Sequence, residues 1–267
     1  LTGKEVGIVT DSNFGESIPL MDTTRLRVSK TIDQQFTKKT IPIIGGFTGA
    51  DQHGHITTFG RGGSDYTAAI IAAAVKADVL EIWTDVNGMF TANPKIVKQA
   101  QPIETISYQE AMELSHFGAK VLYPPTVQPV LDLNIPIHIK NTLEPDAVGT
   151  IISNDVTIST SPVKGISNIG NIALLTLQGS GMIGIPGFSK RLFEVLSQEK
   201  INIILITQSS SEHSICVGVN MQDAHQAKIA VDAEFEKEIQ TQKVEPLIIE
   251  KEVSILALVG EQMKSHP

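Results

Sequence analysis

Residues 58–86 read TFGRGGSDYTAAIIAAAVKADVLEIWTDV and place a glycine-rich turn, a helix and a strand in direct succession. The alanine- and isoleucine-rich segment after the turn predicts a helix over 64–76, with Ser64 and Asp65 as its N-cap and first-turn residues. The apolar run that follows predicts a strand over 79–84. Because alanine-rich helices can pack closely on a sheet, this stretch indicates an α/β layer.

Helices and strands alternate around this stretch as far as residue 153. The alternation predicts an α/β domain over 1–153, with a largely parallel sheet and helices on both faces. Short apolar runs next to glycine or proline predict strands, and apolar residues at helical spacing predict helices. The strands are expected at 40–47, 55–59, 79–84, 135–141 and 150–153, and the helices at 64–76, 107–117 and 126–133.

The pattern changes after the polar residues 154–162, which we interpret as a linker. Residues 163–252 predict the order β-α-β-β-α-β of a ferredoxin-like domain. LTLQGSGM at 175–182 resembles LALVGEQM at 256–263, so 253–267 is expected to begin a second, truncated copy. The elements of the first copy are expected at 172–178, 187–200, 203–209, 214–220, 223–238 and 244–250.

The composition excludes several classes of protein. A net charge of −8 over 267 residues argues against a nucleic-acid partner, and the sequence has no apolar run of about 18 residues that would suggest a membrane span. Cys216 is the only cysteine and cannot form an internal disulfide, so a reducing cytoplasm is expected. The seven histidines show no metal-ligand spacing with this cysteine, and no metal-ligating residues are expected.

The glycine turn has the chemistry of an anion site. Main-chain N–H groups of Gly62 and Gly63 can approach an anion at the start of the helix, where the helix dipole is positive. Arg61 can hold a carboxylate, Ser64 can donate to the same group, and Asp65 can position an ammonium group. A tight turn with a surface arginine–aspartate pair is the alternative interpretation.

Several motifs, in order and spacing, resemble the aspartate kinase catalytic domain of the amino acid kinase family. The resemblance runs over 41–152 and implies an amino acid kinase-like fold. A second group of motifs resembles the ACT regulatory region, in the version found in bifunctional aspartokinase/homoserine dehydrogenases. The motifs are GRGGSDY at 60–66, WTDVNG at 83–88, SYQEA at 107–111 and FGAKVL at 117–122, then VKGIS at 163–167, GMIGIPG at 181–187 and LITQSSSE at 205–212.

The resemblance implies transfer of the ATP γ-phosphoryl group to the β-carboxylate of L-aspartate, the first step of lysine, threonine and methionine biosynthesis. It implies that Arg61, Ser64 and the adjacent Gly62 and Gly63 hold the aspartate, and that Asp65 orients a catalytic lysine. Such a reaction needs positioning and charge neutralisation more than covalent chemistry, and Mg²⁺ is expected with ATP.

The resemblance also implies a set of nucleotide contacts. Thr84 and Asp85 lie at the carboxyl end of a predicted strand, at the edge where open α/β sheets bind ligands. Phe90 stands where the family usually has tyrosine and Lys95 where it usually has arginine, while Lys120 matches the lysine of the family motif. These five residues are expected to contact ATP.

One family motif has no counterpart in this sequence. The phosphate-binding lysine of the family belongs to a K-F-G-G type motif, and nothing here resembles it. We therefore expect this chain alone to lack kinase activity. DSNFG at 11–15 also resembles family sequence, and an Asx-type turn is expected there.

The ACT resemblance implies an effector site for an amino acid. Its loops correspond to 181–188 and 202–208, and pairing of such domains implies a homodimer or tetramer. A lysine effector would favour a carboxylate opposite its ammonium group, yet no acid occurs between 201 and 211, so threonine is the favoured effector and lysine the alternative. The expected contacts are Met182, Ile185, Gly187, Phe188, Asn202, Ile203 and Gln208.

Two other functions stay open. One is a non-catalytic, amino-acid-binding ACT sensor, and the other is an amino acid kinase that acts on glutamate-like substrates. A Rossmann dehydrogenase is disfavoured because no G-x-G-x-x-G follows a strand with an acid about twenty residues later.

Overall fold

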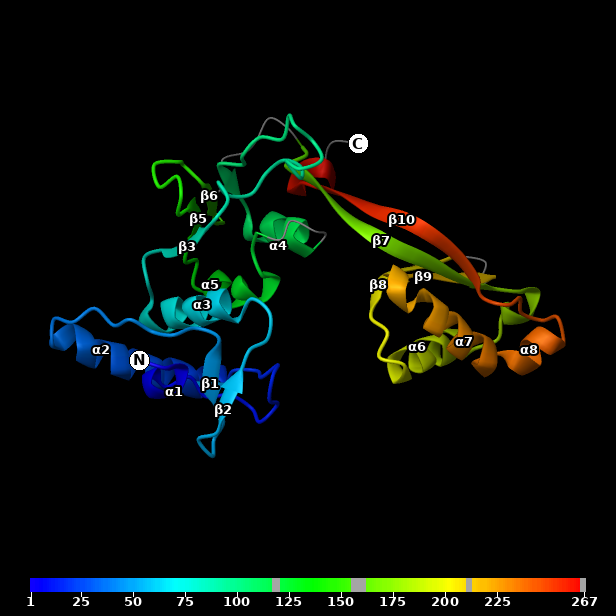
Figure 1. The fold of residues 1–267 in the computed structure, drawn as a ribbon, viewed down its shortest axis with the longest axis horizontal. Helices are drawn as coiled ribbons and strands as arrows, with labels where there is room; N and C mark the ends of the chain where they lie inside the picture. Colours follow the sequence, from blue (N-terminus) through cyan, green and yellow to red (C-terminus); the bar gives the residue numbers. More distant parts are fainter. Residues whose placement is uncertain (117–120, 155–161, 210–212, 265–267) are drawn as a thin grey trace. The chain divides into compact units, whose positions relative to one another are not determined.

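The computed structural model describes residues 1–116, 121–154, 162–209 and 213–264. The chain divides into two compact units, Leu1–Ser167 with Ala257–Pro267, and Asn168–Leu256 (Figure 1). We call them the N-terminal unit and the C-terminal unit. No helix among the described residues is both long enough and apolar enough to cross a membrane.

The main sheet of the N-terminal unit has four strands in the order β3-β5-β6-β4. The pairs β3·β5 and β4·β6 are parallel, so the sheet is largely parallel as expected, whereas β5·β6 is antiparallel. The physical reason is the short connection over 142–149, because a parallel pairing of successive strands needs a longer crossover. The strands are β3 (Leu80–Thr84), β4 (Thr105–Ile106), β5 (Ile137–Asn141) and β6 (Thr150–Ile152).

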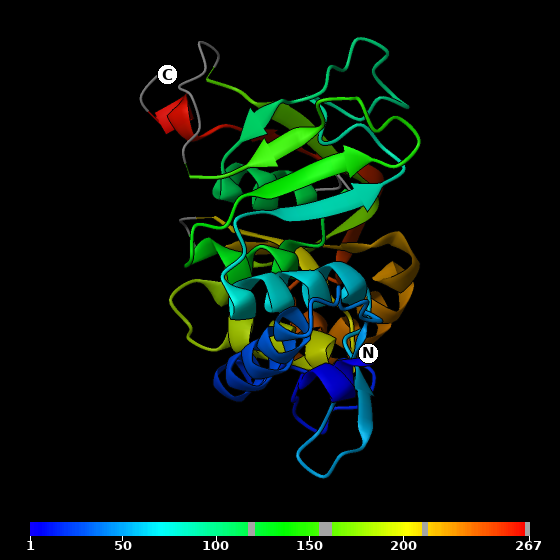
Figure 2. The same ribbon diagram turned by 90° about the vertical axis from the view of Figure 1, so that its left-hand side faces the viewer.

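The described helices next to this sheet pack on one of its faces (Figure 2). They are α3 (Gly63–Val75), α4 (Tyr108–His116) and α5 (Gln128–Leu131), the last preceded by a 3-10 turn at Pro124–Thr126. Alternate residues of the strands, such as Leu80 and Ile82, enter the core beneath them. The opposite face, where helices were also expected, carries Trp83, which is 45% exposed.

A β-hairpin and two helices complete the N-terminal unit. Strand β1 (Thr48–Ala50) pairs antiparallel with β2 (Ile56–Thr58), and α1 (Gly3–Val6) and α2 (Met21–Thr37) pack nearby. The predicted strand at 40–47 is wrong. Pro42 cannot donate to a ladder, and Ile41 and Ile43 are 90% and 84% exposed, so pairing begins only at Thr48.

The N-terminal loop forms the expected Asx turn and contacts the buried carboxylate of Asp51. Asp11 Oδ1 accepts hydrogen bonds from the N–H groups of Asn13 and Ile18 at 3.3 and 2.9 Å. The buried Asp51 accepts from Ser12 Oγ at 3.1 Å and from the backbone and ring of His55 at 2.8 and 3.1 Å. Burial raises the pKa of Asp51, but these hydrogen bonds outweigh it and bring the pKa down to about 2.

Replacing Asp51 with asparagine is expected to lower stability in a pH-dependent way. The folded pKa lies below the unfolded value near 3.9, so the carboxylate stabilises the fold above about pH 4, and this contribution disappears as the pH falls towards 2. Urea unfolding of wild type and Asp51→Asn at pH 7, 5, 4 and 3 would measure the difference. A difference that does not shrink below pH 4 would contradict the assignment.

The C-terminal unit is an α/β domain with the predicted ferredoxin-like order. Its sheet has the order β10-β7-β9-β8, with β9 antiparallel to both neighbours. Helices α6 and α7 bury their apolar sides against it. The elements are β7 (Gly165–Gln178), α6 (Phe188–Gln198), β8 (Ile203–Gln208), β9 (Ser214–Asn220), α7 (Ala224–Glu234), α8 (Glu236–Gln240) and β10 (Ile248–Val259).

Two boundaries in this unit differ from the expectation. The helix predicted at 223–238 is interrupted at Phe235, whose side chain is fully buried. The strand predicted at 244–250 begins at Ile248 and continues to Val259, so the proposed domain boundary at 252/253 lies inside β10. Glu252 has a φ of +58° within this strand, which marks a local irregularity and not an end.

Candidate functional site

The glycine turn leads into α3, and two of its residues have a left-handed backbone conformation. Gly60 and Gly62 have φ values of +73° and +71°, a region that residues with a Cβ rarely occupy. Gly62 is the N-cap of α3 and no side chain caps the helix, so Ser64 is not the N-cap that the sequence predicted. Ser64 instead lies exposed in the first turn.

Two aromatic rings pack against this turn. Neither was among the site residues expected from the sequence. A Cβ on Gly62 would lie 2.3 Å from Cγ of Tyr123, and one on Gly63 would lie 2.8 Å from Cδ2 of Phe47. Only glycine therefore fits at these two positions. The sequence offered a signal for each: Phe47 follows the glycine pair of GGF, and Tyr123 replaces the histidine usual in the resembling family.

Phe47 is held in a conformation that bulky residues rarely adopt. Its φ is +74°, and its N–H donates to Thr67 Oγ1 at 3.0 Å. The Thr67 hydroxyl donates in turn to the carbonyl of Gly63 at 2.7 Å. Such strain persists only where the surrounding structure enforces it, and it concentrates at functional sites.

The charged residues of the turn are available for a ligand. Arg61 is exposed, and within the described residues it forms no ion pair with Asp65, so the surface-pair alternative is not what the structure shows. Asp65 is half-buried, and burial raises its pKa. No hydrogen-bond partner of its carboxylate is found in the described part of the chain, which leaves a partly desolvated acid without a cation.

Replacing Asp65 with asparagine is expected to stabilise this chain at pH 7. A raised folded pKa means that the ionised carboxylate destabilises the fold at neutral pH, by less than about 1 kcal/mol because the group is half-exposed. The gain should fade as the pH falls below about 4, where the acid is protonated in both states. Urea midpoints at pH 7 and 3.5 measure it, with the exposed Asp85→Asn as control. A loss of stability at pH 7 would show that Asp65 has a stabilising partner.

Two of the proposed nucleotide residues, Thr84 and Asp85, lie at the end of the next strand, β3. Helix α3 and strand β3 run in opposite directions, so the start of α3 and the end of β3 lie at the same edge (Figure 2). Thr84 Oγ1 donates to Asp85 Oδ1 at 3.3 Å, and Asp85 is exposed. Phe90 bridges to Pro102, Lys95 is exposed, and Lys120 lies outside the described residues.

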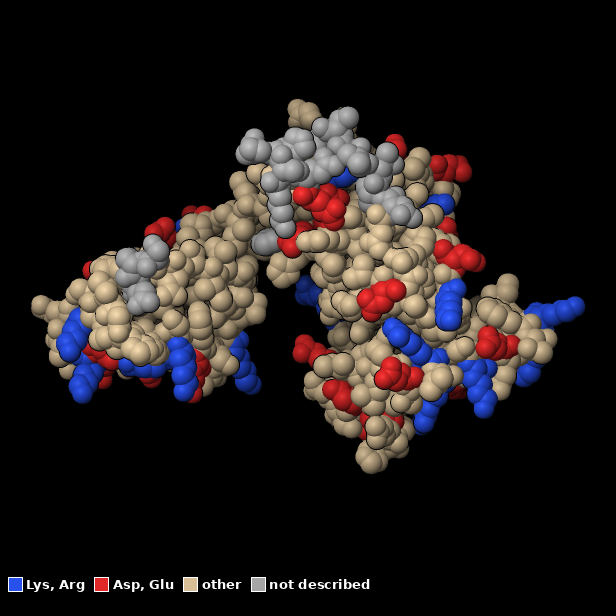
Figure 3. Space-filling view, turned by 180° about the vertical axis from the view of Figure 1, so that it is seen from behind, with Lys and Arg blue, Asp and Glu red and all other residues tan. Residues whose placement is uncertain are grey.

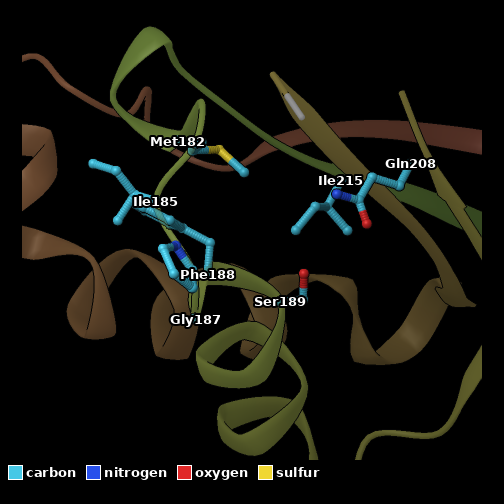
Figure 4. Close-up of a pocket in the computed structure, with 9 residues that line it drawn as sticks. Met182, Ile185, Gly187, Phe188, Ser189, Gln208 and Ile215 are labelled. Carbon is cyan, nitrogen blue, oxygen red and sulfur yellow. The ribbon is translucent and has the colours of Figure 1, made fainter. Parts of the chain in front are cut away.

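A pocket of about 280 Å³ in the C-terminal unit contains most of the expected effector residues (Figure 4). Asn202 and Ile203 do not line it. Asn202 precedes β8 and Ile203 begins it, whereas Gln208 ends the strand, about 16 Å from Ile203. Sequence reasoning missed Ser189 and Ile215. The lining residues are Met182, Gly184, Ile185, Pro186, Gly187, Phe188, Ser189, Gln208 and Ile215.

An aromatic and ionic cluster supports one wall of this pocket. The ring of Phe188 stacks on Phe235 with centroids 5.7 Å apart and an interplanar angle of 7°. The Arg191 guanidinium lies 4.3 Å from the Phe235 ring and donates to Glu234 Oε1 and Glu238 Oε1 at 2.7 and 2.6 Å. The cluster joins α6, which begins at the pocket, to α7 and α8.

Neither unit shows a cluster of metal ligands in its described part. No group of three or more His, Cys, Asp or Glu side chains there is arranged to hold a metal ion.

Comparison with known proteins identifies both units. Residues 6–141 match the model of the amino acid kinase family, and residues 175–235 match an ACT domain. The bifunctional aspartokinase/homoserine dehydrogenase of Haemophilus influenzae is 44% identical over 237 residues, which are 88% of this chain and 29% of that protein.

Solved structures agree with this match. Aspartokinase III of E. coli in complex with lysine and aspartate, in its T-state, superposes with a TM-score of 0.77 at 30% identity, over 97% of this chain and 56% of that one. Its complex with aspartate and ADP, in the R-state, gives a TM-score of 0.74 at 29% identity, over 99% and 58%. This chain thus spans under a third of the curated relative and just over half of each solved chain.

The chain therefore belongs to the amino acid kinase family, carries an ACT domain, and is similar to the aspartokinase part of bifunctional aspartokinase/homoserine dehydrogenases.

Proposed function

We propose that this chain is the aspartate-binding and regulatory part of an aspartate kinase, which phosphorylates the β-carboxylate of L-aspartate with ATP. The observation that carries the proposal is the glycine turn at the start of α3. It combines left-handed glycines, an exposed Arg61 and a half-buried Asp65 at one edge of an α/β sheet.

The turn can hold the carboxylate of an amino acid. The first N–H groups of a helix have no intrahelical acceptor. The N–H of Gly63 donates to Gly60 O at 3.3 Å, so it is not the free donor that the sequence suggested, and the N–H of Tyr66 donates to Gly62 O at 3.1 Å. The N–H groups of Ser64 and Asp65 therefore remain for an anion, which the helix dipole also favours. Arg61 adds a charged fork, and the Asp65 carboxylate can hold the lysine that the family supplies from another segment.

ATP would be bound at the end of β3. We assign Thr84, Asp85, Phe90, Lys95 and Lys120 to this contact, and the ADP complex of the E. coli relative supports the use of a nucleotide. Mg²⁺ takes oxygen ligands and is usually held by one or two carboxylates together with the phosphates. The exposed Asp85 fits this requirement, and the ion would neutralise phosphate charge when bound.

The pocket of the C-terminal unit would hold the effector, and we favour threonine. Its lining residues include no acid, whereas Gln208 and Ser189 can pair with a hydroxyl or with the charged groups of an α-amino acid. Lysine is the alternative, since it is the ligand named for the E. coli relative. We further propose pairing through ACT domains into a homodimer or tetramer, in the cytoplasm.

An acyl phosphate assay tests this function. We expect the present chain alone to be inactive, because the family's phosphate-binding lysine is not among its residues. When this span replaces the matching span of the Haemophilus influenzae relative, ATP-dependent hydroxamate should form with L-aspartate. Arg61→Gln in that chimera should lower kcat/KM at least 100-fold. Turnover of L-glutamate or N-acetylglutamate in place of aspartate would favour a different amino acid kinase. A folded chimera with no turnover would favour a non-catalytic sensor.

A further inference from the structure

A groove lies between α2 and the C-terminal end of α3 in the N-terminal unit. It encloses about 570 Å³. Helix α3 has 13 residues and is about 20 Å long, so the groove is a helix length away from the glycine turn. It is therefore separate from the site assigned to aspartate and ATP.

The groove is basic. Arg25 and Lys30 enter it from α2, and Lys76 enters from the end of α3. Asp33 is the acid among the lining residues, which leaves two net positive charges. Within the described residues, no ion pair joins Asp33 to these cations. Lys and Arg side chains gather over the part of the N-terminal unit that carries α2, with a few acids between them (Figure 3).

One of these cations has a buried donor without an acceptor. Nε of Arg25 is buried and has no hydrogen-bond partner among the described residues. Thr24 and Val28, on the adjacent stripe of α2, are fully buried and fix the position of Arg25 on the helix. Native proteins seldom leave a buried N–H unpaired, so a donor of this kind often faces a bound ion or water.

The net charge of the groove and its apolar lining residues indicate which kind of ligand would fit. A phosphate monoester carries nearly two negative charges at pH 7, which match the local excess, and its oxygens fit the guanidinium fork. The C-terminal end of α3 is negative, so the phosphate would lie on the α2 side. Ala74 and the 39% exposed Leu133 provide an apolar surface beside it. We propose that this groove binds a small phosphorylated molecule with an apolar body.

Nitrogen-15 NMR of the arginine Nε–H signals tests the proposal, with phenyl phosphate as the probe. One signal, assigned by its loss in Arg25→Gln, should move downfield and saturate. Calorimetry should show at least tenfold weaker binding for Arg25→Gln and several-fold weaker binding for the exposed Lys30→Gln. Two control variants should bind as wild type does. They are Lys38→Gln, at the C-terminal end of α2 but outside the groove, and Arg61→Gln, in the glycine turn.

Five outcomes would overturn the proposal. The first four concern Arg25, the other variants and the anions. They are an Arg25 signal that does not move, equal binding by well-folded Lys30→Gln, equal loss in Arg61→Gln, and equal affinity for inorganic phosphate, sulfate and phenyl phosphate, which would indicate an adventitious ion only. Phenol is expected not to bind, and binding of phenol alone would also contradict it. Circular dichroism melts establish that each variant is folded.

Discussion

Replacing Gly62 with alanine is expected to destabilise the N-terminal unit by about 2–5 kcal/mol. A residue with a Cβ costs about 1–2 kcal/mol in left-handed backbone, and Gly62 has a φ of +71°. The new Cβ would also lie 2.3 Å from Cγ of Tyr123, and overpacking of this kind typically costs about 1–3 kcal/mol more. Urea unfolding followed by fluorescence measures the change.

Gly60 provides a matched control in the same turn. Its φ is +73°, but a Cβ there would approach no atom closer than the carbonyl oxygen of Gly15 at 3.3 Å. Gly60→Ala should therefore cost only about 1–2 kcal/mol. In a Tyr123→Ala background, the extra cost of Gly62→Ala should largely disappear. Equal losses of unfolding free energy in Gly60→Ala and Gly62→Ala would show that Tyr123 does not pack against the turn.

Replacing Phe235 with alanine is expected to destabilise the C-terminal unit by about 3–5 kcal/mol, as for other fully buried aromatic residues. The substitution removes the ring that stacks on Phe188 and that the Arg191 guanidinium covers. Since Phe188 lines the pocket, affinity for the proposed effector should fall as well. Thermal unfolding followed by circular dichroism, together with threonine titration, measures both effects.

Ile229 in the neighbouring helix α7 provides the control for Phe235. It is 60% exposed, so Ile229→Ala should change the free energy of unfolding by less than about 0.5 kcal/mol and leave effector affinity unchanged. If Phe235→Ala matched this control, the aromatic cluster would not support the pocket.

The elements that the sequence predicted well are those with strong local patterns. The helix over 64–76 and the strand over 79–84 appear within one residue of their predicted bounds, because alanine richness and apolar runs act locally. The predictions that failed concern features that depend on residues far away in the sequence. Nothing in TIPIIGGF shows that pairing starts only at Thr48, and the antiparallel course of β6 depends on how 142–149 turns.

The candidate sites show the same division. Arg61, Asp65 and the pocket residue Gln208 could be proposed from the sequence, since their motifs are contiguous. Tyr123 and Phe47 lie 61 and 15 positions from Gly62 in the sequence, and only the fold brings them to the turn. Ile215 enters the pocket for the same reason, whereas Ser189 directly follows the expected pocket residue Phe188 in the sequence.

The central proposal is that the pocket of the ACT domain binds threonine as an effector. Calorimetric titration of this chain with L-threonine and, separately, with L-lysine tests it most directly. Threonine should give saturable heat and lysine none, and Gln208→Leu should remove the threonine signal. Binding of lysine without threonine, or an unchanged threonine affinity in Gln208→Leu, would contradict the account.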